Sequence, residues 1–141
     1  MISLMGAETY EWPDDMPADC PPAGATEPDV VVYRFVKADP LVPADFDRPI
    51  DKPRKAEPSD DELCELSALS VFTDVSDVPI ARKVIPGFKK KLVALAQLNA
   101  GHGLVEQAPT ACDGSPTMDS HHNWWVPEGL DPLTLFTLVE V

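Results

Sequence analysis

Two of the three histidines and two of the three tryptophans of this 141-residue chain lie within residues 120–126. Histidine changes its charge near neutral pH, so His121 or His122 could act as a general acid or base. Tryptophan is enriched among the side chains that dominate protein interfaces. The stretch therefore indicates two kinds of chemistry, which are acid–base catalysis and recognition of another protein through Trp125.

The element that must position these side chains is a strand over 121–126, because Trp and Val favour strands and Pro127 would end it. Alternate side chains of a strand point to opposite faces. We therefore expect Trp124 and Val126 to lie in the core. The other face, expected to point outward, carries His121, Asn123 and Trp125. Trp125 is then an exposed anchor for a partner. The alternative is that this face is aromatic and solvent-exposed but has no binding role.

Four side chains are the natural candidates for metal ligands: His102, Cys112, His121 and His122. Structural zinc sites usually combine two closely spaced pairs of Cys or His ligands. Here the single adjacent pair is expected on opposite faces of a strand, and the cysteine is isolated. We therefore predict no metal and no cofactor.

A rival hypothesis is a small enzyme or ligand-binding protein. Arg34 lies inside the apolar run 30–36 and would need a partner if it were buried. A pocket between the 121–126 strand and the 38–58 segment could combine Arg34 with His121 or His122. The chain has no nucleophile elbow and no glycine-rich phosphate loop, so the sequence favours a non-enzymatic role.

The formal net charge of −13 is the strongest global feature of the chain. Such a charge would repel nucleic-acid phosphates and anionic membranes, so we expect neither as a partner. No apolar run approaches the roughly 20 residues that a membrane helix needs. Three widely spaced cysteines and no secretory signal predict reduced thiols in a cytoplasmic protein.

Residues 1–29 contain acidic residues and five prolines but no Lys or Arg. This composition predicts an acidic, proline-rich arm that is extended or disordered. Tyr10, Trp12 and Met16 are larger apolar residues than a solvated tail requires. They would dock the arm onto its own domain or onto another protein, and both alternatives stay open.

Residues 30–141 are expected to form one small α+β domain with four or five strands and two or three short helices. A long proline-rich loop is predicted at 38–58, and helices are predicted to begin at Ser59, near Pro79 and at Phe88, the last ending near Asn99. Strands are predicted at 30–36, 69–73, 103–106, 121–126 and 136–140.

These observations favour a small acidic protein that acts by binding another protein with a basic surface. The contact would use the arm, with Trp12, and the strand face of His121, Asn123 and Trp125. Electrostatic attraction would steer the partner, and an apolar anchor would hold it. The oligomeric state stays open.

Overall fold

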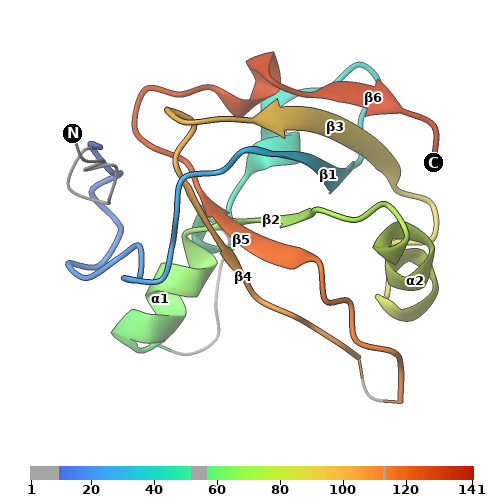
Figure 1. The fold of residues 1–141 in the computed structure, drawn as a ribbon, viewed down its shortest axis with the longest axis horizontal. Coiled ribbons are helices and arrows are strands. Elements are labelled where there is room, and N and C mark those ends of the chain that lie inside the picture. The colour runs from blue at the N-terminus through green and yellow to red at the C-terminus, as the bar shows by residue number, and fades with distance from the viewer. Residues whose placement is uncertain (1–9, 52–56, 113) are drawn as a thin grey trace.

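A single antiparallel sheet organises the protein, as seen in a computed structural model that describes residues 10–51, 57–112 and 114–141 (Figure 1). The α+β class is confirmed, and the sheet has six strands instead of four or five. Their order is β4-β5-β2-β1-β3-β6. The strands are β1 (Val30–Val36), β2 (Leu69–Phe72), β3 (Leu92–Leu98), β4 (Leu104–Gln107), β5 (His121–Trp125) and β6 (Thr137–Val139).

Strand β1 lies near the middle of the sheet, as its β-branched and aromatic sequence predicts. It pairs with β3 along its whole length, from Val30 opposite Leu98 to Val36 opposite Leu92. On its other side it pairs with β2 at one position only, where Tyr33 lies opposite Phe72. The sheet is therefore continuous on one side of β1 and much less tightly paired on the other.

The helix predicted from Phe88 to Asn99 is wrong, because this segment contains β3. The spacing of Phe88, Leu92 and Leu95 fits a helical stripe, but these residues do not share one buried face here. Strand β3 lies between β1 and β6, so tertiary pairing on both edges overrides the local pattern. The three lysines at 89–91 precede the strand, which removes their conflict with a helix dipole.

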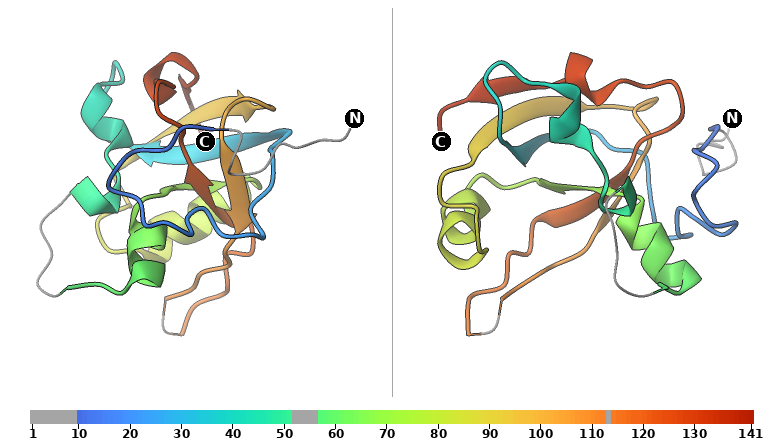
Figure 2. Two further views of the ribbon diagram at one scale, coloured as in Figure 1. Left: turned by 90° about the vertical axis from the view of Figure 1, so that its left-hand side faces the viewer. Right: turned by 180° about the vertical axis from the view of Figure 1, so that it is seen from behind.

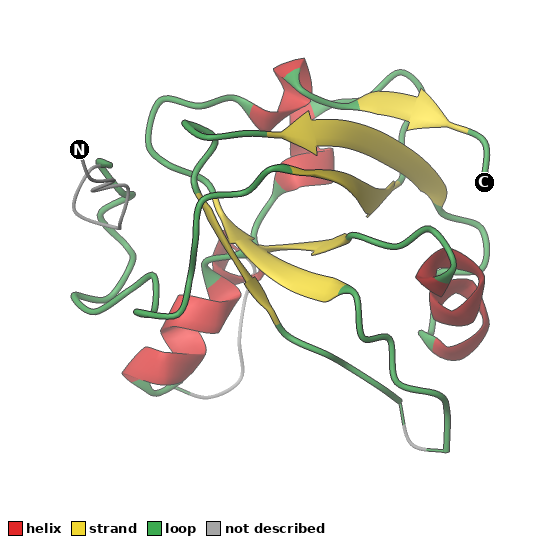
Figure 3. Ribbon diagram, viewed as in Figure 1, coloured by secondary structure: helices red, strands yellow, loops and turns green. Residues whose placement is uncertain are grey.

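Helix α1 (Asp60–Leu66) begins where its capping box predicts. The Ser59 hydroxyl accepts from the Glu62 backbone N–H at 3.2 Å, and the Ser59 N–H donates to the Glu62 carboxylate at 3.1 Å. Helix α2 (Asp77–Val84) carries Pro79 in its first turn, as predicted. The two helices lie near opposite ends of the sheet (Figure 3). Neither helix, nor any other in the described part of the chain, could span a bilayer.

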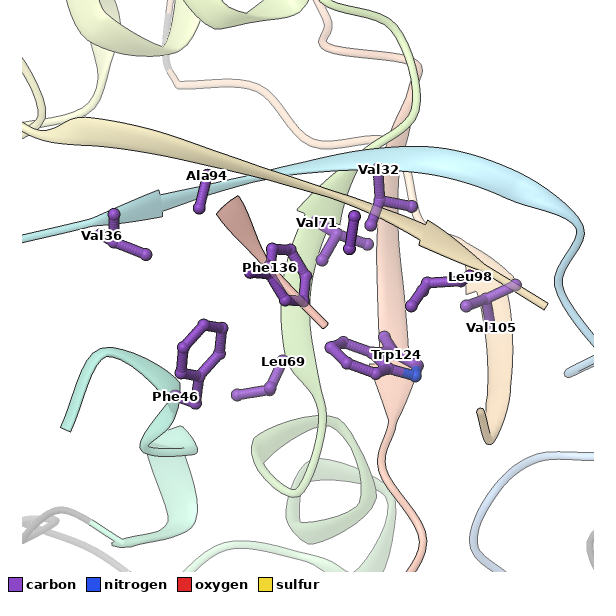
Figure 4. Close-up of a cluster of buried hydrophobic side chains, with 11 residues drawn as sticks. Val32, Val36, Phe46, Leu69, Val71, Ala94, Leu98, Val105, Trp124 and Phe136 are labelled. Carbon is purple, nitrogen blue, oxygen red and sulfur yellow. The ribbon is translucent and has the colours of Figure 1, made fainter. Parts of the chain in front are cut away.

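The main core lies on one face of the sheet, around Trp124 and Phe136 (Figure 4). The ring of Phe136 lies 5.1 Å from the ring of Phe46 and 5.8 Å from that of Trp124, measured between centroids. Phe46 comes from the long loop, whose described part contains two short 3-10 helices, η2 (Pro43–Phe46) and η3 (Pro49–Asp51). A third, η4 (Pro132–Thr134), lies close to η2. The loop is thus tied to the core through Phe46.

Two smaller apolar clusters lie apart from the main core. Helix α2 packs Val78 and Ala81 against Phe35 and Phe72. The third cluster, here named the Trp125 cluster, has three buried members, with four partly buried neighbours. Its residues are Cys20, Ala68, Trp125, Trp12, Met16, Ala25 and Cys64. Strand β5 is therefore packed on both of its faces.

The described part of the arm, residues 10–29, passes beside α1 (Figure 2) and is attached to the domain at several points. Cys20 forms a disulfide with Cys64 in α1, so the expectation of reduced thiols is wrong for these two cysteines. Thr26 pairs with Val105 of β4 through two backbone hydrogen bonds, of 2.9 and 2.8 Å. Arg48 forms an ion pair with Asp15 at 2.6 Å. The arm thus docks onto its own domain, while residues 1–9 lie outside the described part.

Candidate functional site

Trp125 is 1% exposed, so the expectation that it is an exposed anchor is wrong. Its indole N–H donates to the Cys64 carbonyl at 2.9 Å, and the ring lies in the Trp125 cluster. The predicted alternation is correct, because Trp124 packs in the main core instead. The arm and α1 cover the second face, and a disulfide between distant segments is not visible in the local pattern.

Arg34 and the two strand histidines are not brought into one pocket. The His121 Nδ1 lies 2.7 Å from the Ala108 carbonyl, and the His122 Nδ1 lies 2.8 Å from the Ser120 carbonyl. Arg34 instead donates to the carbonyl oxygens of Asp45 in η2 and Ser70 in β2, and two hollows that it lines contain neither histidine. These hollows therefore do not combine Arg34 with His121 or His122, as the enzyme hypothesis requires.

Burial lowers the pKa of His121 below its ordinary value of 6.5, with a smaller contribution from the charge of His122. The hydrogen bond to Ala108 opposes this shift without cancelling it. Since the unfolded chain then binds a proton more readily, His121 lowers stability as the pH falls below about 6.5.

We expect the NMR titration midpoint of His121 to lie below a pH of about 6.5. His121→Gln should show a shallower loss of stability between neutral pH and pH about 5, whereas an equal slope would contradict this.

The four candidate metal ligands are also spread apart. The His102 Nδ1 accepts from the Asn99 backbone N–H at 3.0 Å in the turn between β3 and β4. Cys112 lies in the loop before β5, within a turn closed by Ser115. Within the described ranges, no three His, Cys, Asp or Glu side chains form a group that could hold a metal ion.

A hollow between the arm, α1 and β5, here named the acidic hollow, has a volume of about 380 Å³. Five carboxylates line it, and none of the described lining residues is a Lys, Arg or His. They are Asp19 from the arm, Asp60, Asp61 and Glu65 from α1, and Glu106 from β4. Trp125, Asn123, Cys64, Pro17 and Pro22 contribute further walls. The hollow thus combines negative charge with an apolar surface.

The disulfide explains why the carboxylates of the arm and of α1 meet. Asp19 directly precedes Cys20 and Glu65 directly follows Cys64, although 44 positions separate the two cysteines. Joining the cysteines therefore brings two acidic side chains to one site, despite their mutual repulsion. An acidic residue next to each of two cysteines was the only signal in the sequence, and it becomes informative only once the pairing is known.

Comparison of the chain with known protein families, with curated proteins and with solved structures finds no match.

Proposed function

We propose that this chain is a non-enzymatic protein that binds a basic segment of another protein in the acidic hollow. The observation that carries the proposal is the convergence of five carboxylates from three segments on one cavity. Lys and Arg side chains would supply the missing positive charge. The net charge of −13 would also attract a basic partner from a distance and speed association.

The shape and walls of the hollow suit such side chains. Its volume lies within the range of about 300–1,000 Å³ that is typical of ligand sites. Lys and Arg place long methylene stems along apolar surfaces while their charged ends stay near polar groups. Pro17 and Pro22 would contact the stems, and the oxygen of the Asn123 amide would accept from the charged end. Trp125, which is 1% exposed, lies beneath this surface and is not an inserted anchor.

Neutralising one carboxylate in each segment tests the proposal. The variant is Asp19→Asn/Glu65→Gln/Glu106→Gln, and the probe is a fluorescent glycine–serine peptide that carries three arginines. If each exposed ion pair contributes about 0.5 kcal/mol, three lost pairs weaken binding about tenfold. Fluorescence anisotropy at physiological salt concentration measures the dissociation constant.

The control variant removes the same charge elsewhere. Glu128→Gln/Asp131→Asn/Glu140→Gln alters three exposed carboxylates that do not line the acidic hollow. We expect this variant to retain most of its affinity. Equal weakening in both variants would show that the peptide responds only to net charge and would contradict a site at the hollow.

A further inference from the structure

Arg34 is a partly buried cation that makes no carboxylate hydrogen bond. Its Nε and Nη2 donate to the Asp45 carbonyl at 3.1 and 3.0 Å, and its Nη1 donates to the Ser70 carbonyl at 2.9 Å. A guanidinium has five N–H groups, so two remain after these three bonds. The ion pairs of the described residues do not include Arg34.

The carboxylate of Asp45 is occupied with the backbone. The Asp45 carboxylate accepts from the Lys37 and Val42 backbone N–H groups, at 2.7 and 3.2 Å. It therefore holds the η2 turn together instead of pairing with Arg34. Burial lowers the pKa of Arg34 to about 10, although the charges of Asp45 and Asp47 act in the opposite direction. Burial thus disfavours the charged form of Arg34 more than the two carboxylates favour it.

Two hollows adjoin this guanidinium, and both are lined by Arg34, Phe35, Asp47 and Lys91. The smaller has a volume of about 240 Å³ and lies where β1 and β2 share only one paired position. Its remaining walls are mainly apolar and include Phe72, Phe88, Leu69 and Pro49. The Lys91 ammonium lies 3.9 Å from the centroid of the Phe88 ring, and Phe72 is 3% exposed, so the accessible apolar wall consists mainly of Pro49 and Phe88.

We propose that the smaller hollow, here named the Arg34 hollow, binds a small organic carboxylate with a flat apolar body. The carboxylate would accept the two remaining N–H groups of Arg34, since charge-assisted bonds of this kind are short and strong. The ammonium group of Lys91 would add a second positive charge. The flat body would extend over Pro49 and beside Phe88, whose ring the Lys91 ammonium contacts, because burial of apolar surface is favourable.

The single negative charge of a carboxylate fits this site better than the double charge of a phosphate monoester. Asp47 lines the hollow as well, and its carboxylate would repel a second negative charge on the ligand. The acidic hollow plays no part in this inference, because the two hollows share none of their lining residues. The two proposals can therefore fail separately.

Benzoate, benzamide and phenyl phosphate separate the contributions of charge and body. Isothermal titration calorimetry of the full-length protein should show benzoate binding at least tenfold tighter than benzamide, which has the same ring but no charge. Phenyl phosphate should bind more weakly than benzoate. NMR shift changes should centre on Phe88 and on the Nη groups of Arg34. Equal binding of benzoate and benzamide, or no benzoate binding at millimolar concentrations, would overturn the proposal.

A lysine substitution provides a test that leaves the backbone bonds of Arg34 intact. Lys91→Gln should weaken benzoate binding about fivefold or more, because the second positive charge is lost. Lys90→Gln removes the same charge from the neighbouring exposed residue, which does not line the hollow, and should leave the affinity unchanged. Equal affinities of the two variants would contradict a site beside Lys91, whatever the effect of changing Arg34.

Discussion

Removal of the Cys20–Cys64 disulfide should lower the free energy of unfolding by about 4 kcal/mol. The two cysteines are 44 positions apart, and closing a loop of this length removes conformational entropy from the unfolded chain. The bond also fixes the arm beside α1, so its loss should loosen the Trp125 cluster. The measurement is urea unfolding of Cys20→Ser/Cys64→Ser beside the oxidised wild-type protein.

Cys112 provides the matched control, because it is the free cysteine among the described residues. Cys112→Ser should unfold at nearly the same urea concentration as the wild type. Adding a reductant should destabilise the wild type and the Cys112 variant alike, and it should leave the double variant unchanged. If the double variant were as stable as the wild type, the disulfide would have no stabilising role.

Trp125→Ala should lower the free energy of unfolding by about 3–5 kcal/mol, which is the usual cost of truncating a buried aromatic residue. Trp125 is 1% exposed and Trp124 is 0% exposed, so both substitutions should have effects of this size. A whole domain is stable by only about 5–15 kcal/mol, so either change removes a large share. Thermal and urea unfolding provide the measurement.

Two further variants separate packing from hydrogen bonding. Trp125→Phe keeps an aromatic ring but leaves the Cys64 carbonyl without its indole donor, so we expect a smaller loss of about 1–3 kcal/mol. Val75→Ala alters a side chain that is 40% exposed and should change stability by less than about 0.5 kcal/mol. Retention of full stability by Trp125→Ala would show that the arm does not cover this face in solution.

The elements predicted correctly are those specified by neighbouring residues. The β-branched run of β1 and the capping box of Ser59 and Glu62 each contain their signal within a few positions. The alternation in β5 also follows from local geometry, so Trp124 and Trp125 point to opposite faces as expected. Local sequence therefore predicts the type of an element and the direction of its side chains.

The errors arise where distant segments decide the outcome. β3 is a strand because β1 and β6 flank it, although its leucine spacing fits a helix. Trp125 is buried because the disulfide brings the arm across β5. The acidic hollow depends on the same long-range bond, so its carboxylates from the arm, α1 and β4 lie far apart along the chain. Pairing between remote residues is the information that periodicity and composition lack.

The backbone pairing of Thr26 with Val105 also affects whether the edge strand of the sheet can pair with other molecules. β4 is the last strand on its side, and Val105 directs both its N–H and its carbonyl outward to Thr26. Unpaired groups on such a border invite strands from other molecules and lead to aggregation. The arm therefore covers the exposed edge of β4. A chain beginning at Pro28 would leave this edge open and would self-associate more readily.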